Sequence, residues 1–196
     1  CNFHIKIYKL EMFKKLAKIK YLPNKFEIIE DGDHVICAIT GKKISLGVDS
    51  FEDFKMWYEE DFVELSNLLH SKKLCDFIYL ICGPDKSYIA KKIINLSKKD
   101  YFIDCSQKDL SGVIFALKSS DFFIGNNSGP LNLSAALNIK SFGLIANDPV
   151  SELRYSKIHP ITPIDYIDNV WNRDRKGMKK LTVKRVFHKI IESLNK

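Results

Sequence analysis

A stretch of small and polar residues, IGNNSGPLNLSAAL at 124–137, has the composition of a phosphate-binding turn. An apolar strand is predicted to end at Gly125. A helix is predicted to begin near Pro130, because proline is favoured at the first helical position. Ser128 or Gly129 then lies at the N-cap. Small residues let backbone N–H groups approach a ligand, and a helix N-terminus adds partial positive charge. The pattern favours a phosphate or diphosphate, and an ordinary tight turn is the alternative.

Two further segments contain side chains suited to a nucleotide. In ICGPDKSYIA at 81–90, a strand again leads through Gly-Pro into a helix, and Asp85 could accept hydrogen bonds from ribose hydroxyl groups. The alternative for Asp85 is a turn residue with a solvated carboxylate. In KMWYEEDF, Lys55 could reach a diphosphate as a point charge, whereas Trp57 and Phe62 are expected to anchor the helix that follows.

The elements that must hold these segments alternate between strands and helices. Apolar runs rich in β-branched and aromatic residues predict strands near 34–39, 77–83, 101–105, 121–126 and 141–146. Helical periodicity predicts helices at 60–72, 87–99, 109–120, 129–139 and 182–195, with N-caps at Ser87, Asp109 and Thr182. Short connections join these elements. The alternation predicts an α/β fold, a Rossmann-like doubly wound parallel sheet with helices on both faces.

Two segments do not follow this alternation. Residues 40–57 are too many for an ordinary strand-to-helix connection, and they contain two glycines. We therefore expect a long ligand-binding loop there, since ligands bind at the carboxyl ends of parallel strands. Residues 5–20 place apolar side chains at helical spacing, which predicts an amphipathic helix that YLPNK then breaks.

Composition narrows the classes of protein to consider. With 45% hydrophobic and 28% charged residues, the 196-residue chain is not disordered, collagen-like or a coiled coil. No apolar run is long enough for a membrane-spanning helix. The five cysteines form no CxxC pair and the five histidines lack metal-ligand spacing. We therefore expect buried reduced thiols, a cytoplasmic protein and no metal site.

The net charge of +7 is unevenly distributed. Residues 1–25 and 151–196 each carry +6, whereas residues 26–150 carry −5. Basic ends are typical of solvated helix faces in a lysine-rich chain. They also fit peripheral contact with an anionic surface, such as membrane headgroups or a phosphorylated glycolipid. No basic stripe interleaved with aromatic residues is present in the sequence, so nucleic acid is not an expected partner.

In order and spacing, these segments resemble the C-terminal half of glycosyltransferase family 9, the ADP-heptose:lipopolysaccharide heptosyltransferases. That family has a Lys-x-Trp-Pro segment, a Gly-Gly-Pro turn and a Gly-Asn-Asp-Ser-Gly-x-x-His stretch running into Ala-Ala-Leu. The chain has, in the same order, Lys55-Met56-Trp57, Cys82-Gly83-Pro84, Gly125-Asn126-Asn127-Ser128-Gly129 and Ala135-Ala136-Leu137. The resemblance covers most of residues 34–195 and is strongest at 77–145.

The resemblance implies one half of a GT-B glycosyltransferase, in which two Rossmann-like domains enclose a cleft. Residues 31–196 would form the C-terminal donor-binding domain, and residues 1–30 an interdomain connector helix and linker. The donor would be ADP-heptose or another nucleotide sugar. The acceptor would be the lipopolysaccharide core or another glycan. The expected donor-binding residues are Lys55, Asp85, Asn126, Asn127, Ser128, Gly129 and Asn132.

The resemblance also implies an inverting reaction that needs no metal or cofactor. Its general base is expected in an N-terminal domain, so no residue of this chain is expected to be catalytic. The chain begins with Cys1 and is expected to be a fragment that is inactive alone. The full enzyme would act in the cytoplasm, peripherally at the inner face of the bacterial inner membrane.

Three residues depart from the family pattern, and Tyr58, which replaces the proline of Lys-x-Trp-Pro, is the smallest departure. Asn127 replaces the aspartate of Asp-Ser-Gly, and Asn132 replaces the histidine that follows it. Asparagine keeps the shape and part of the hydrogen bonding, but it loses the negative charge or the titratable ring. Two alternatives therefore stay open: a catalytically degenerate Rossmann-like binding module, and a GT-B enzyme that uses another nucleotide sugar.

Overall fold

The structure is a computed structural model that describes residues 18–22, 25–30, 41–168, 171 and 173–195. The chain divides into two compact units, residues 1–41 and residues 42–196. In the first unit, β1 (Lys18–Leu22) and β2 (Lys25–Glu30) pair antiparallel. The predicted helix at 5–20 is wrong at 18–20, where lysine and apolar residues alternate with the period of a strand. The rest of that helix lies outside the described residues, and the connector role of residues 1–30 stays a prediction.

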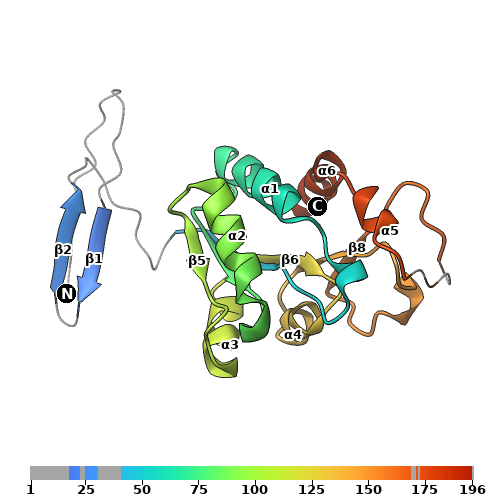
Figure 1. Ribbon diagram of the computed structural model, residues 1–196, viewed down its shortest axis with the longest axis horizontal. Coiled ribbons are helices and arrows are strands. Elements are labelled where there is room, and N and C mark those ends of the chain that lie inside the picture. Colours follow the sequence, from blue (N-terminus) through green and yellow to red (C-terminus); the bar gives the residue numbers. More distant parts are fainter. Residues whose placement is uncertain (1–17, 23–24, 31–40, 169–170, 172, 196) are drawn as a thin grey trace. The chain divides into compact units, whose positions relative to one another are not determined.

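The second unit contains a six-stranded sheet whose strands all run parallel (Figure 1). Across the sheet the order is β5 (Phe102–Asp104), β4 (Phe77–Ile81), β3 (Lys43–Gly47), β6 (Phe122–Asn126), β7 (Ser141–Leu144) and β8 (Ile158–Ile161). The chain runs from β3 to one edge, returns to β6 beside β3, and continues to the other edge. The strand order therefore reverses between β3 and β6, the switch point where doubly wound folds bind ligands. The predicted fold class is confirmed.

Helices cover both faces of this sheet (Figure 1). One face packs against α1 (Glu59–Ser71), α2 (Ser87–Ser97) and α6 (Val183–Leu194), and the other against α3 (Leu110–Lys118) and α4 (Gly129–Ala136). The remaining helix, α5 (Lys176–Lys179), is a single turn before α6. Short 3₁₀ turns occur at Asp53–Lys55, Pro84–Lys86 and Val150–Glu152. Each face has its own apolar core, so the sheet is buried on both sides, as parallel sheets require.

Two strands of the sheet were not predicted. The central strand β3 falls within residues 40–57, which the sequence assigned to a loop, and the strand predicted at 34–39 lies outside the described residues. Polar residues conceal β3 in the sequence, yet Ser45 is fully buried and its Oγ lies 2.8 Å from Ser120 Oγ. The edge strand β8 contains Pro160, which is tolerated because an edge strand leaves one side unpaired.

The helix starts agree with the predicted caps in two cases out of three. Asp109 Oδ1 accepts a 2.8 Å hydrogen bond from the Gly112 N–H, and Thr182 Oγ1 accepts one of 3.4 Å from the Arg185 N–H. The predicted cap at Ser87 is wrong. Ser87 is the first residue of α2, and Lys86 precedes it at the N-cap without a side-chain bond. The 3₁₀ turn before α2 already directs the chain into the helix.

The cysteines in the described part of the chain are structural. Cys75, Cys82 and Cys105 are free and buried, and burial raises the pKa of Cys75 and of Cys82 to about 12. The expected buried thiols are confirmed at these three positions, whereas Cys1 and Cys37 lie outside the described residues. No helix in the described ranges is long and apolar enough to cross a bilayer.

Candidate functional site

Three glycines lie in register at the carboxyl ends of the central strands. Gly47 of β3 pairs with Gly125 of β6, which pairs with Gly143 of β7. The Phe123 ring lies beside Gly47 and Gly125. A Cβ atom at Gly47 would lie 2.5 Å from Phe123 Cζ, and one at Gly125 would lie 2.7 Å from it. Larger residues would displace the ring or the strands. The glycines thus let the turn after β6 lie close to the loop after β3.

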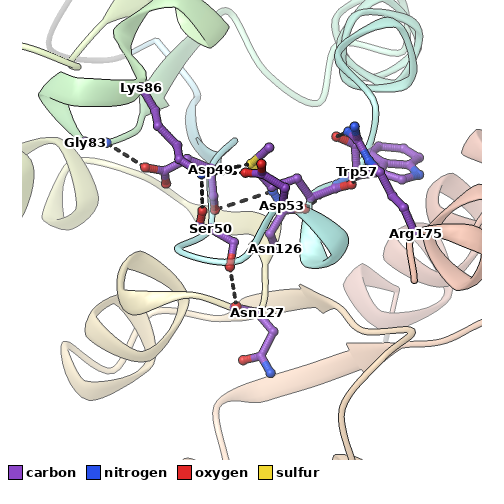
Figure 2. A network of polar contacts seen from close by, with 10 residues as sticks. Asp49, Ser50, Asp53, Trp57, Gly83, Lys86, Asn126, Asn127 and Arg175 are labelled. Carbon is purple, nitrogen blue, oxygen red and sulfur yellow. Dashed lines mark hydrogen bonds and ion pairs between the residues drawn. The ribbon is translucent and has the colours of Figure 1, made fainter. Parts of the chain in front are cut away.

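The loop of residues 48–58, which follows β3, is bound by residues of the turn after the neighbouring strand β4 (Figure 2). Asp49 Oδ2 accepts a 2.7 Å hydrogen bond from the Gly83 N–H. Lys86 Nζ lies 2.8 Å from both the Ser50 carbonyl oxygen and Asp53 Oδ1. Burial raises the pKa of Asp49, although the Gly83 N–H and the Lys86 charge oppose the increase. The turn after β4 therefore fixes the first half of the loop.

The second half of the loop is fixed by a buried asparagine and an arginine (Figure 2). Asn126 is fully buried, and its Oδ1 accepts a 2.9 Å hydrogen bond from the Trp57 N–H. Arg175 donates to the carbonyl oxygens of Met56 and Trp57 at 2.9 and 3.1 Å, and its guanidinium lies 4.2 Å from the centre of the Tyr58 ring. The predicted donor-binding residue Asn126 therefore has a structural role, because its amide positions the loop.

Trp57 and Phe62 anchor the start of α1, as the sequence predicts. Both side chains are buried, and their rings meet edge to face at 5.1 Å. Trp57 Nε1 also donates a 2.8 Å hydrogen bond to the Leu181 carbonyl oxygen. The loop is therefore fixed at both ends, and Lys55 projects from a rigid segment.

A cavity of about 180 Å³ opens beside this loop. Its lining brings together three of the predicted site residues, Lys55, Asn127 and Asn132. The cavity also contains charged and aromatic side chains that were not predicted: Asp148, Glu152, Arg154 and Trp171. Residues from the loop after β3, the turn after β6 and the segment after β7 thus meet in one place, as expected for carboxyl ends of adjacent parallel strands.

Lys55 is the best-placed cation in this cavity. Its Nζ lies 2.7 Å from Glu52 Oε2 and 3.0 Å from Asp148 Oδ1, and its side chain is 17% exposed. Burial alone would lower the pKa of Lys55, but the contacts with the Glu52 and Asp148 carboxylates outweigh burial and raise it. Lys55 is therefore fully protonated at neutral pH and available to an anion that competes with the two carboxylates.

The first turn of α4 lies beside the cavity and has unused hydrogen-bonding groups. Ser128 lies at the N-cap, but its buried Oγ has no hydrogen-bond partner among the described residues. Gly129 is exposed, and a Cβ there would meet nothing within 4 Å, so the fold itself does not require glycine at this position. Asn132 Nδ2 donates a 3.1 Å hydrogen bond to the Ser128 carbonyl oxygen. An anion could therefore approach the free N–H groups of α4 without obstruction.

Asp85 lies apart from these residues. It is exposed in the 3₁₀ turn after β4 and does not line the cavity. Because β4 is next to β3 in the sheet, Asp85 lies at the same edge of the sheet as Lys55. Its proposed contact with a ribose stays a prediction.

Sequence reasoning missed the contributions of Asp148 and Arg175. Asp148 follows β7 in an Asn-Asp-Pro turn, and a search for polar residues after every predicted strand would have found it. Arg175 donates hydrogen bonds to backbone carbonyl groups that lie 118 or more residues earlier in the chain, and no local sequence pattern indicates such contacts. No group of three or more His, Cys, Asp or Glu residues suited to a metal ion is present in the described ranges.

Comparisons with known proteins agree on one family. The model of glycosyltransferase family 9 (heptosyltransferase) matches residues 24–190. Escherichia coli ADP-heptose lps heptosyltransferase II has a similar structure, with a TM-score of 0.68 and 15% identity over 81% of this chain and 48% of that protein. For E. coli heptosyltransferase WaaC with ADP the values are 0.65 and 22%, over 80% of this chain and 46% of that protein.

A glycosyltransferase of family 9 from Veillonella parvula DSM 2008 is also similar, with a TM-score of 0.67 and 14% identity over 81% of this chain and 47% of that protein. The chain thus spans about half the length of the solved structures it matches. Among curated proteins, none matches the sequence.

Proposed function

Because the chain belongs to glycosyltransferase family 9, the heptosyltransferases, we propose that it forms the nucleotide-sugar-binding half of a GT-B glycosyltransferase. The donor is ADP-heptose, and the acceptor is the core of lipopolysaccharide. Two solved relatives support the donor class, since one is WaaC with ADP and another is WaaC with ADP-2-deoxy-2-fluoro heptose. The acceptor is proposed by analogy with the name of the E. coli lps heptosyltransferase II.

The observation that carries this proposal is the meeting of Lys55 with the first turn of α4. Lys55 and Asn132 line one cavity, and Asn132 is bonded to the N-cap residue of that helix. A helix N-terminus stabilises an anion by about 0.3–1 kcal/mol when exposed, and by up to ~2 kcal/mol when partly buried. A hydrogen bond to a charged group contributes about 1.5–3 kcal/mol. Together these groups suit the two phosphates of a nucleoside diphosphate.

In the proposed reaction, an acceptor hydroxyl oxygen attacks the anomeric carbon of the donor sugar. The new C–O bond forms as the bond to the diphosphate oxygen breaks, and the configuration inverts. A carboxylate base in the other half of the enzyme takes the hydroxyl proton. The diphosphate leaves with the bonding electron pair, and Lys55 and the α4 N–H groups stabilise its increased negative charge.

The proposed partner at the membrane is the glycolipid acceptor. Exposed lysines of α5 and α6, among them Lys176, Lys179 and Lys184, supply positive charge that would favour peripheral contact with anionic headgroups. We propose that the enzyme works on the cytoplasmic side of the inner membrane. Binding of the chain to vesicles with and without anionic lipid tests this contact.

A second candidate is a binding module without catalysis. The side chains of both residues that depart from the family motif at 125–132 form hydrogen bonds within the protein. Asn127 Nδ2 donates a 2.6 Å hydrogen bond to Asp148 Oδ2, and Asn132 Nδ2 donates one to the Ser128 carbonyl oxygen. Calorimetric titration of ADP, UDP and GDP into the 196-residue chain separates the candidates. The proposal expects saturable binding of ADP above the other two. Preferential binding of UDP or GDP would favour another donor, and no binding of any nucleotide would favour a scaffold.

A further inference from the structure

Asp148 is a buried carboxylate in the proposed donor site. It follows β7, and its side chain is only 6% exposed. Buried carboxylates are rare unless they are paired, because leaving water is costly for the charged form. Asp148 has two partners, the Asn127 amide at 2.6 Å and Lys55 Nζ at 3.0 Å. It therefore connects two side chains that the sequence assigned to the donor.

The hydrogen-bonding capacity of this carboxylate is not used up. Oδ2 accepts a hydrogen bond from the Asn127 amide, and the buried Oδ1 has the Lys55 ammonium 3.0 Å away as its partner. A carboxylate can accept about four hydrogen bonds. Asp148 also lines the 180 Å³ cavity, so a diphosphate that draws Lys55 away would leave Oδ1 able to accept hydrogen bonds from the rest of the ligand.

The backbone around Asp148 is held in place by a tyrosine from the segment after β8. Tyr166 Oη lies 2.7 Å from the Asp148 carbonyl oxygen, and the Val150 N–H donates to the same Oη at 2.8 Å. Burial, followed by contact with Asp168, raises the pKa of Tyr166 to about 12, so it stays a neutral donor. The carboxylate of Asp148 is thus positioned before any ligand binds.

The charge of Asp148 has opposite consequences for the two parts of a nucleotide sugar. A diphosphate is repelled by the carboxylate and must compete with it for Lys55. Sugar hydroxyl groups donate hydrogen bonds, which a buried carboxylate accepts strongly. Asp148 should therefore weaken the binding of a free nucleoside diphosphate and strengthen the binding of the intact donor.

We infer that Asp148 is a positioning and specificity residue of this site, which pairs with Lys55 in the free protein and accepts hydrogen bonds from donor-sugar hydroxyl groups once the diphosphate has bound Lys55. The inference rests on the proposed function. It gives the site a means to prefer the substrate over the nucleoside diphosphate product. The carboxylate that the family pattern places at residue 127 is absent here, and Asp148 supplies one at hydrogen-bond distance from that residue.

The test compares ADP with ADP-heptose in calorimetric titrations of the 196-residue chain and its Asp148→Asn variant. Asparagine keeps the size of the side chain and removes its charge. We expect the affinity for ADP to rise about threefold and that for ADP-heptose to fall about tenfold, as the loss of one repulsion and one charged hydrogen bond implies. Misfolding would lower both affinities, so the opposite signs identify the proposed role.

Two further variants serve as controls. Glu52→Gln removes the other partner of Lys55 without touching Asn127, so both affinities should rise and their ratio should stay constant. Asp165→Asn removes a surface carboxylate that pairs with Lys180 outside the cavity, and neither affinity should change. An unchanged affinity ratio in Asp148→Asn, or a parallel loss of both affinities, would overturn the inference. If wild type binds neither ligand, the proposed function fails first, and the inference fails with it.

Discussion

The two sides of the candidate site use their polar groups differently. On the β3–β4 side, formed by residues 48–58 and 83–86, the polar side chains of Asp49, Lys86 and the inserted Asn126 all bond to the protein itself. On the β6–β7 side, formed by residues 127–132 and 147–149, Ser128 Oγ is buried without a hydrogen bond among the described residues, and Asp148 Oδ1 is paired with Lys55, the cation proposed to bind the ligand.

The difference indicates that the β3–β4 side supports the site and that the β6–β7 side binds the ligand. Buried polar groups are nearly always hydrogen-bonded in folded proteins, so unbonded ones at the carboxyl edge of a sheet indicate where a ligand completes the network. The β3–β4 side holds Lys55 rigidly, and the β6–β7 side leaves groups free for the ligand. Variants of the residues that support the loop on the first side should therefore affect stability, whereas variants of Lys55 and of the second side should affect binding.

Asn126→Ala should have the largest effect on stability. It leaves the buried Trp57 N–H without a partner, which costs about 1–3 kcal/mol of unfolding free energy. Urea denaturation followed by tryptophan fluorescence measures the change. Asn95→Ala, on the exposed face of α2, is the matched control and should leave the midpoint nearly unchanged. Equal stability of Asn126→Ala and wild type would contradict the supporting role of the β3–β4 side.

Lys55→Ala should have the largest effect on binding. It removes the cation of the cavity and leaves the Glu52 and Asp148 charges facing the diphosphate, so ADP affinity should fall at least about tenfold, or about 1.4 kcal/mol. Calorimetric titration of ADP provides the measurement. Lys92→Ala is the control, since Lys92 pairs with Glu59 and Glu60 and does not line the cavity. Unchanged ADP affinity would exclude Lys55 from the site.

Ser128→Ala should reduce ADP affinity about fivefold, the value of one ordinary hydrogen bond of about 1 kcal/mol. Stability should not decrease, because the Ser128 Oγ makes no hydrogen bond in the free protein. Ser119→Ala, in which a bond to the Phe115 carbonyl oxygen is lost, should behave in the opposite way, with lower stability and the same affinity. Lower stability of Ser128→Ala at unchanged affinity would mean that the two sides of the site do not differ as described.

The smallest expected effect is a pH dependence from Asp49. Burial raises its folded pKa above the ordinary value of 3.8. Because the raised pKa favours protonated Asp49 in the folded state, its contribution to the free energy of unfolding is complete below pH 3.8. This contribution is lost as the pH rises through the folded-state pKa. Relative to Asp49→Asn, which does not titrate, wild type should lose stability over that interval. Denaturation midpoints of both proteins at a series of pH values measure the difference, and a constant difference would contradict the raised pKa.

The sequence predicts the parts of this fold that depend on local patterns. The strands β4 to β7 and the caps Asp109 and Thr182 follow from apolar runs and local turn chemistry. The strand β3 could not be predicted in the same way, since its Ser45 is buried against a serine 75 residues further along the chain. Lysines conceal the strand β1 in the sequence, and a proline conceals the strand β8.

The site shows the same limit. Lys55, Asn127 and Asn132 were found because each lies in a turn or loop that has its own sequence signal, and the structure brings them to one cavity. The roles of Asn126 and Asp148 could not be read from sequence. The first bonds to Trp57 across 69 residues and the second to Asn127 across 21, so each role exists only in the folded chain.

The most direct test of the central claim is an NMR titration of the ¹⁵N-labelled chain with ADP. We expect the largest chemical-shift changes at the backbone amides of Ser128, Gly129 and Leu131 and in the loop around Lys55, because the diphosphate binds between them. The amide signals near a larger cavity of about 380 Å³, which is lined by Lys140 and His159, should not shift. Shifts confined to that cavity, or no shifts at saturating ADP, would contradict the account.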